Sequence, residues 1–234
     1  MNYKPIIIVA GEPNSIFLEL FFKSIKNNKY KSPLILICSK KILNLQLKKF
    51  NFKKKINYLN IVKLKKNNLS NKFINLIDVE YKQKKIFEKI SSKSNLYITN
   101  CFKIAFNLID RKFSNKLING PISKKNFLKK KTLGITEYVA DRFSVKKKAM
   151  LIYNSKLAVC PLTTHLPLKL VAKNINKKSI LEKVKLIVNF YKINFNKKPK
   201  IAILGLNPHC ESIDKFNEDE TILKPSIKYL KKLD

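Results

Sequence analysis

The sequence predicts an α/β protein whose largely parallel sheet is covered by helices. Short apolar runs alternate with longer amphipathic segments along the chain, as they do in βα units. The runs are continuously apolar, which is typical of parallel strands buried on both faces. With 234 residues, 45% of them hydrophobic, the chain suits one large domain or two small ones. We expect two subdomains, 1–120 and 121–234.

The first half begins with a strand, "KPIIIVA", that ends in a Gly-Glu-Pro-Asn turn. A helix is then expected from Asn14 or Ser15, with its apolar residues on one side. A second buried run, "PLILICS", is followed by an amphipathic segment. The expected strands are 4–10, 33–39, 56–64, 73–79 and 116–120, and further helices are expected at 41–50 and 83–111.

The second half repeats the alternation. Pro167 suits the first turn of a helix, because its missing N–H costs nothing there. Ser179 and Glu182 form an S-x-x-E capping box for the helix that follows. The expected strands are 150–154, 157–162 and 200–206, and a last helix is expected from about Asp219 to Leu233.

The net charge is +35, from 50 basic and 15 acidic residues. Such a charge is typical of nucleic-acid-binding proteins. However, Arg111 and Arg142 are the only arginines, and dedicated nucleic-acid readers use arginine for bidentate contacts. The lysines are spread along the chain in short groups. We therefore favour a biased composition on solvated faces over a nucleic-acid footprint.

This interpretation predicts weak, sequence-independent binding to DNA, because only phosphate contacts are available. Raising the salt from low to moderate concentration should abolish the binding, since each lysine–phosphate contact releases counterions. A salt titration monitored by fluorescence anisotropy measures this. Nanomolar, sequence-selective binding at physiological salt would instead favour a nucleic-acid-binding protein over an enzyme.

No apolar run approaches the ~20 residues that cross a bilayer, and "PIIIVA" is interpreted as a strand and not as a signal peptide. The four cysteines are scattered without a CxxC pair, which predicts reduced thiols in a cytoplasmic protein. With only four glycines, the chain contains neither G-x-G-x-x-G nor a P-loop, so a classical Rossmann site is excluded. It also lacks the motifs of serine hydrolases and thiol proteases. Catalytic and cofactor-binding residues stay unassigned.

The chain contains two histidines, His165 in "CPLTTHLPL" and His209 in "GLNPHCES". Each follows the carboxyl end of a predicted strand, where open α/β sheets bind ligands. Two neutral imidazoles on stiffened loops would form half of a divalent-metal site. Alternatively, each imidazole hydrogen-bonds the backbone of its loop, and the pattern leaves both interpretations open. Asp214, Glu218 and Glu220 are possible further ligands, although such residues more often cap or solvate a helix.

Two other loops are expected near this edge. "NGPISK" (119–124) follows its own strand, and Ser123 is expected to cap the turn there. In "GITEY" (134–138), Thr136 is a plausible helix N-cap, with Glu137 in the first turn.

Together these motifs resemble one family. "GEP" ends the first strand, and "GPISK", "G-x-TE", "TTHLPL" and "GLNPH" follow in order. From about residue 4 to its end, the chain is similar to the 4-hydroxythreonine-4-phosphate dehydrogenases of pyridoxine synthesis. "TTHLPL" and "GLNPH" are the specific parts of this resemblance. It implies the isocitrate/isopropylmalate-dehydrogenase fold, with two subdomains around a cleft, which binds NAD or NADP without a glycine fingerprint.

The resemblance also implies the chemistry. His165 and His209 match histidines that bind a divalent cation (Zn, Mg or Co), and Thr136 matches a threonine that contacts the substrate. The secondary alcohol of 4-phosphooxy-L-threonine is oxidised by NAD(P)+, and the product loses CO2 to give 3-amino-2-oxopropyl phosphate. The implied assembly is a cytoplasmic homodimer with its active site at the interface. No specific nucleic acid and no membrane are expected as partners.

The sequence departs from this family in three places. Ile135 stands where the family has a histidine, and "NSIFLE" replaces a glycine-rich segment. Family members also continue past the position that matches Asp234, and that part carries the third metal histidine. The 234-residue chain is therefore expected to have little activity alone. Ile135 leaves open a paralogous dehydrogenase for another phosphorylated hydroxy acid, and the charge leaves open a basic nucleic-acid-binding protein.

Overall fold

The computed structural model describes residues 3–27, 30–83, 85–128, 132, 134–209 and 217–232. The chain divides into two compact units, 1–131 and 132–234. The sequence analysis placed the boundary at Gly120, whereas in the structure it lies after residue 131. Residues 121–128 stay with unit 1, because Phe127 stacks on Phe102 with ring centroids 6.2 Å apart and Asn126 O accepts a hydrogen bond from Asn95 Nδ2 at 2.7 Å.

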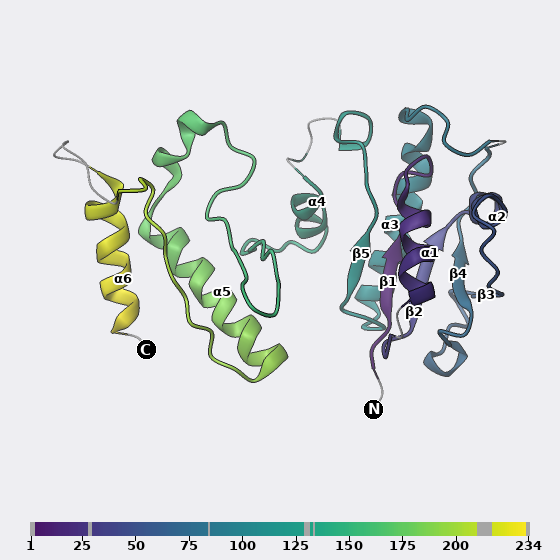
Figure 1. Ribbon diagram of the computed structural model, residues 1–234, viewed down its shortest axis with the longest axis horizontal. Coiled ribbons are helices and arrows are strands. Elements are labelled where there is room, and N and C mark those ends of the chain that lie inside the picture. Colours follow the sequence, from purple (N-terminus) through teal and green to yellow (C-terminus); the bar gives the residue numbers. More distant parts are fainter. Residues whose placement is uncertain are drawn as a thin grey trace. The chain divides into compact units, whose positions relative to one another are not determined.

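Unit 1 is built on a five-stranded sheet in the order β3-β4-β2-β1-β5 (Figure 1). Every neighbouring pair is parallel, which confirms the predicted fold class. The register places Ile8 beside Leu36 and Ile118. The strands are β1 (Ile6–Val9), β2 (Leu34–Cys38), β3 (Ile56–Tyr58), β4 (Ile74–Asp78) and β5 (Leu117–Asn119).

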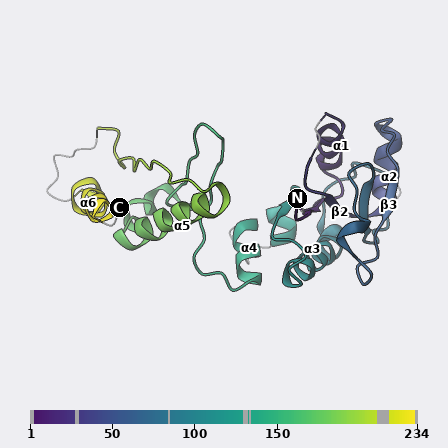
Figure 2. The same ribbon diagram turned by 90° about the horizontal axis from the view of Figure 1, so that it is seen from below.

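Helices cover both faces of this sheet (Figure 2). On one face, Ile8, Leu36 and Leu76 form a core with the apolar sides of the first two helices. The third helix packs on β1 and β2 from the other face, where Phe102 is fully buried. The β1 and β2 side chains alternate between these two cores, so both faces must be apolar. The helices are α1 (Phe17–Asn27), α2 (Lys40–Lys49) and α3 (Asn95–Asp110).

The predicted helix 83–111 is only partly correct, because α3 begins at Asn95. The preceding segment is held as a loop by a distant side chain. Asn14 Oδ1 accepts hydrogen bonds from Gln83 Nε2 at 2.6 Å and from Glu88 N at 2.8 Å. Such bonds compete with the helical backbone pattern.

Unit 2 contains α4 (Ile135–Arg142), α5 (Lys177–Phe195) and α6 (Lys224–Lys231). Its core is a small cluster around the buried Ile175, Ile180 and Leu223. A turn at Asp219–Leu223 leads directly into α6, close to the last helix that the sequence predicts. Pro167 precedes two short 3₁₀ turns, Leu168–Leu170 and Ala172–Asn174, in place of the expected α-helix.

Other predictions for unit 2 were wrong. The expected hairpin is reduced to one antiparallel bridge between Ile152 and Val159, and residues 200–206 form no strand. A strand needs a neighbour to pair with, and none lies beside 200–206 in the described part of unit 2. The proposed capping box is also incorrect. Asn176 is the N-cap of α5, and its side chain accepts a hydrogen bond from Ser179 N at 2.9 Å.

Across the residues that the structure describes, no helix is both long enough and apolar enough to cross a membrane.

Candidate functional site

The loops after β1 and β5 meet at the carboxyl edge of the sheet in unit 1. Glu12 N donates a hydrogen bond to Pro121 O at 2.8 Å. Gly11 has a φ of +75°, and a Cβ at Gly11 or Gly120 would collide with the backbone of the other loop. Glycine is therefore required for this close approach. "GEP" and "GPISK" lie side by side as a result, and Ser123 caps the turn that follows, as predicted.

Glu12 is a buried acid at this edge, with 3% of its surface exposed. Its Oε2 accepts a hydrogen bond from Ser94 Oγ at 2.8 Å, and its Oε1 has no partner in the described structure. Burial raises the pKa of the Glu12 carboxyl, and the bond from Ser94 offsets part of this effect. The edge of unit 1 thus carries a carboxyl group that gains a proton more readily than a surface acid.

A pocket of about 730 Å³ lies beside the carboxyl ends of β2 and β4. Its lining carries charges of both signs, from Lys40, Lys41 and Lys82 and from Asp78 and Glu80. Asp78 already accepts a hydrogen bond from Lys40 N at 2.7 Å. The mixed lining does not identify a site for the phosphates of a dinucleotide.

In unit 2, His165 faces the first turn of α4. A Cβ built on Gly134 would lie 3.2 Å from His165 Nε2 and 2.9 Å from Glu137 Oε2. Thr136 is in the same turn and is exposed. It is not the N-cap that the sequence suggested, because α4 begins at Ile135 and Gly134 takes the N-cap position without a side chain. The structure thus brings together His165 and the "GITEY" segment.

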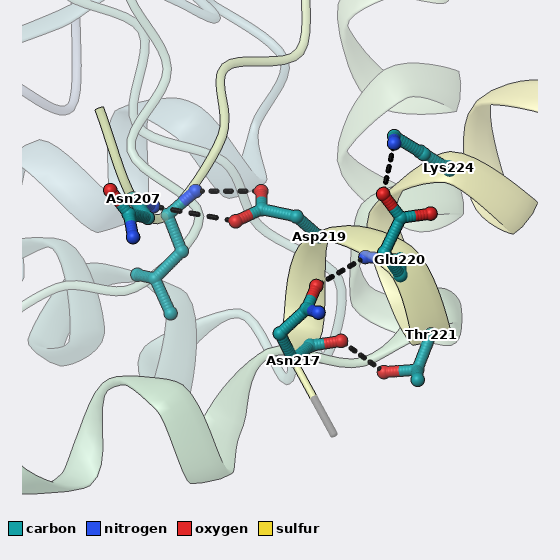
Figure 3. Close-up of polar contacts among 7 residues, drawn as sticks. Asn207, Asn217, Asp219, Glu220, Thr221 and Lys224 are labelled. Atoms are coloured by element: carbon teal, nitrogen blue, oxygen red, sulfur yellow. Dashed lines mark hydrogen bonds and ion pairs between the residues drawn. The ribbon is translucent and has the colours of Figure 1, made fainter. Parts of the chain in front are cut away.

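His209 lies two residues after Asn207, on a loop that Asp219 holds in place; Figure 3 shows the bond between Asn207 and Asp219. Asp219, with 6% of its surface exposed, accepts hydrogen bonds from Leu206 N at 3.0 Å and from Asn207 N at 3.5 Å. Asn207 Oδ1 in turn accepts a hydrogen bond from His209 N at 3.0 Å. A short relay of bonds therefore runs from Asp219 to the backbone of His209.

The turn that carries Asp219 is stabilised by bonds among the residues next to it. Asn217 Oδ1 accepts a hydrogen bond from Glu220 N at 2.8 Å, and Asn217 O accepts one from Thr221 Oγ1 at 2.6 Å. Glu220 pairs with Lys224 one turn later (Figure 3). Of the acids considered as further metal ligands, Glu220 is thus engaged by a lysine, and Asp214 lies outside the described residues.

The sequence predicted that each histidine follows a strand, and this prediction is wrong for both. His165 has a φ of +58°, in the left-handed region, and His209 sits in a turn. Neither imidazole has a hydrogen-bond partner among the described residues. In that same part of the chain, no three His, Cys, Asp or Glu side chains lie close enough together to hold a metal ion. The two histidines have different neighbours. His165 lies near Gly134, and the backbone of His209 is bonded to Asn207.

Two relevant residues were not selected from the sequence. Asp219 was interpreted only as the start of a helix, and Glu137 only as an acid in a first turn. Neither position carries a local pattern that would distinguish it, because Asp219 bonds a loop that is distant in sequence and Glu137 lies near a loop that is also distant.

Comparison with known proteins decides the family. The family described as "Pyridoxal phosphate biosynthetic protein PdxA" matches residues 29–234. The chain belongs to the PdxA family. A PdxA relative from Sulfurihydrogenibium sp. (strain YO3AOP1), named 4-hydroxythreonine-4-phosphate dehydrogenase, is 33% identical over 97% of this chain and 70% of its own length. The chain thus spans about 70% of the length of that relative.

Two further matches are a relative that is named for another substrate and a solved structure. A relative from Salmonella typhimurium is named D-threonate 4-phosphate dehydrogenase and is 25% identical over 97% of this chain and 71% of its own length. The solved structure of 4-hydroxythreonine-4-phosphate dehydrogenase from Klebsiella pneumoniae superposes with a TM-score of 0.81 and 21% identity. The match covers 98% of this chain and 72% of that one, and it supports the α/β fold.

Proposed function

We propose that this protein is a metal- and NAD(P)-dependent dehydrogenase that oxidises 4-phosphooxy-L-threonine in pyridoxal 5'-phosphate synthesis. The observation that carries the proposal is the 33% identity, over 97% of the chain, to a relative named for this activity. Oxidation of the secondary alcohol gives a β-keto acid, and loss of CO2 from it would yield 3-amino-2-oxopropyl phosphate. The charge of +35 suits a phosphorylated substrate.

The residues of unit 2 fit a divalent cation in their donor types. His165 and His209 are exposed imidazoles without hydrogen-bond partners among the described residues, and an unpaired carboxylate oxygen of Glu137 lies beside His165. The two histidines would hold the cation, and Thr136 would contact the substrate. A cation bound there would supply Lewis acidity at the alcohol oxygen of the substrate. The type of ligand decides which of Zn, Mg and Co binds best, and imidazole ligands favour Zn or Co over Mg.

The nicotinamide cofactor rests on the resemblance to the dehydrogenases alone. The four glycines form no phosphate-binding loop, and the pocket beside β2 and β4 mixes lysines with acids. Neither feature distinguishes residues that would hold NAD or NADP.

The test is the formation of NADH or NADPH by the purified protein, as its reading frame encodes it. Substrate and metal are each added and withheld in turn. We expect turnover that needs 4-phosphooxy-L-threonine, a divalent cation and a nicotinamide nucleotide together. A protein that binds zinc through its histidines and yet reduces neither nucleotide with any phosphorylated hydroxy acid would contradict the proposal.

A second candidate is a dehydrogenase for D-threonate 4-phosphate, which the named Salmonella relative favours. Ile135, next to Thr136 in the first turn of α4, stands where the resemblance implies a substrate-contacting histidine, so the two candidates are tested at this position. If Ile135 only removes one contact, Ile135→His should raise kcat/KM for 4-phosphooxy-L-threonine by about 10- to 100-fold. A hydrogen bond to a charged group contributes about 1.5–3 kcal/mol.

The measurement compares both substrates with the wild-type protein and with Ile135→His. Ile193→His, on the exposed surface of α5, is the matched control and should change neither value. Two results together would favour the second candidate. The wild-type protein would prefer D-threonate 4-phosphate, and Ile135→His would not raise kcat/KM for 4-phosphooxy-L-threonine.

We also propose that the protein is a homodimer. The segment that carries Tyr153 and helix α5 expose an aromatic cluster, in which Tyr153 stacks on Phe195 at 5.5 Å and Phe195 meets Phe190 at 5.7 Å. Exposed apolar patches of this kind mark interaction surfaces. Tyr153→Asp should raise the dimer dissociation constant by about 30-fold or more, because a central aromatic contributes about 2 kcal/mol.

Sedimentation equilibrium measures this constant. Tyr58→Asp makes the same change at a tyrosine of similar exposure in unit 1. This control should leave the dimer dissociation constant unaltered. A wild-type chain that stays monomeric at high concentration would contradict the proposed dimer.

A cytoplasmic location belongs to the same proposal. Cys38 and Cys101 are free and buried thiols. Burial raises the pKa of Cys101 to about 12, so this thiol stays protonated at neutral pH. Unreactive free thiols suit a reducing compartment.

A further inference from the structure

Glu12 and Ser94 of unit 1 form a buried contact that is short of one proton. Ser94 Oγ lies 2.8 Å from Glu12 Oε2 and 3.1 Å from the carbonyl oxygen of Ser91. A serine hydroxyl has one proton and two lone pairs, so it can donate to only one of these two oxygens. If Glu12 is a carboxylate, both oxygens are acceptors only, and one of them faces a lone pair of Ser94 at hydrogen-bonding distance.

The other carboxyl oxygen of Glu12 also favours a neutral acid. Glu12 is buried, and its Oε1 is shielded from solvent and has no hydrogen-bond partner in the described structure. A buried oxygen without a partner is more costly when its group is charged than when its group is neutral. Burial raises the pKa of the Glu12 carboxyl, and the bonds from Ser94 and from the backbone of Asn14 lower it by less.

The groups around Glu12 provide no positive charge among the described residues. None of the ion pairs there includes Glu12. Ser94 contacts it from the turn before α3, and the carbonyl of Pro121 bonds its backbone from the loop after β5. On the loop after β4, the titratable groups near it are the Tyr81 phenol, whose pKa both acids raise, and the Glu88 carboxyl. A neutral phenol and a second acid do not stabilise a carboxylate at position 12.

We propose that Glu12 is a pH-sensitive switch that is neutral in the resting protein. Its Oε2–H donates to Ser94 Oγ, and the proton of Ser94 then goes to Ser91 O, so each hydroxyl has one acceptor. When Glu12 loses its proton, the Ser94 hydroxyl turns to the carboxylate and Ser91 O loses this bond. Ser91 is the N-cap of the turn Ser92–Ser94, which leads into α3. The proton therefore links the loop after β1 to the start of α3, at the edge where open α/β sheets bind ligands.

The direction of the pH dependence follows from where the proton is bound. Burial raises the pKa of Glu12 above its ordinary value of 4.5, so the folded protein keeps a proton that the unfolded chain has already lost. The stability that the neutral acid contributes is complete below that ordinary value and falls as the pH rises toward the raised pKa of the folded protein. For one proton, the folding equilibrium constant falls in this window by at most about tenfold per pH unit.

Carbon NMR of the side-chain carboxyl groups measures the proton directly. The protein, as its reading frame encodes it, is labelled with carbon-13 at the glutamate carboxyl carbons, and Glu12→Gln assigns the signal. We expect the Glu12 signal to titrate at a higher pH than that of Glu80, an exposed acid that Glu80→Gln assigns. A midpoint for Glu12 at or below that of Glu80 would overturn the proposal.

Urea denaturation provides the second readout. The amide signals of β1 and β2 are followed, so that the unfolding of unit 1 is measured. Glu12→Gln has the donor and the carbonyl of the neutral acid but cannot ionise. The ratio of its folding constant to that of the wild type should therefore rise with pH, by up to about tenfold per unit within the window. Glu80→Gln is the matched control and should show no such rise.

Glu12→Met tests the bond to Ser94, because methionine fills similar space without a donor. It should be less stable than Glu12→Gln at every pH, and the two should become about equal when Ser94→Ala removes the acceptor. Equal stability of the two variants in the presence of Ser94 would show that the bond contributes nothing and would contradict the proposal.

The remaining outcomes are also decisive. If Glu12→Gln is less stable than the wild type at neutral pH, or does not fold where the wild type folds, the native group is a carboxylate and the switch does not exist. Neither readout needs turnover. An inactive protein would therefore contradict the function proposed above and leave the switch at Glu12 unaffected.

Discussion

In the protein as its reading frame encodes it, replacing His165 or His209 by alanine is expected to remove tight zinc binding and to lower turnover by about 100-fold or more. Loss of a residue that only orients a metal ligand typically costs 10- to 100-fold in affinity or activity, so loss of the ligand itself belongs at or above the top of that range. Both side chains are exposed, and neither has a hydrogen-bond partner among the described residues. Their removal should therefore leave the folded state nearly unchanged.

The measurements are a calorimetric zinc titration and NAD(P)H formation under matched conditions. Each variant has a control on an exposed neighbour without a metal donor. Leu168→Ala follows His165 with 88% of the side chain exposed, and Leu204→Ala precedes His209 with 82% exposed. Both controls should bind zinc like the wild type. If a histidine variant keeps tight zinc binding and turnover, that histidine is a loop residue and not a ligand.

The parallel sheet of unit 1 could be predicted because the signal for each strand is local. Strands buried on both faces must be apolar at every position, so β1 and β2 are visible as "IIIV" and "LILIC". The segment before α3 could not be predicted in this way. Its conformation depends on Asn14, which bonds Gln83 and Glu88 from a distant part of the sequence.

Unit 2 shows where local patterns compete. Ser179 and Glu182 satisfy a capping box, but Asn176 lies three residues earlier and caps α5 instead. The apolar run 200–206 has the composition of a strand, yet pairing depends on a neighbour, and the described residues of unit 2 provide none. Composition alone contains no information on whether a partner strand is present.

The candidate site shows the same limit. His165 and His209 could be selected from the sequence because each belongs to a specific motif. Their surroundings could not, since Gly134 lies near His165 across a loop, and Asp219 accepts bonds from Leu206 N and Asn207 N across another. An acid that bonds the backbone of a distant loop leaves no pattern in the sequence around it.

The relay from Asp219 to His209 leads to the second large effect. Asp219→Ala should lower zinc affinity by about 10- to 100-fold, because the loop that carries His209 loses both of its bonds to the buried carboxylate. It should also lower the free energy of unfolding by about 1–3 kcal/mol, since Leu206 N and Asn207 N are left without their acceptor. Urea denaturation measures this loss.

A purely structural role for Asp219 would lower stability without a matching change at the metal. Asp219→Asn separates the two roles, because its remaining side-chain oxygen can still accept the 3.0 Å bond from Leu206 N. This variant should recover much of the zinc affinity. Glu220→Ala, at the adjacent acid, breaks only an exposed ion pair with Lys224 and should leave zinc binding unchanged. If Asp219→Ala binds zinc as tightly as the wild type while its unfolding free energy falls, the relay supports the fold and does not position His209.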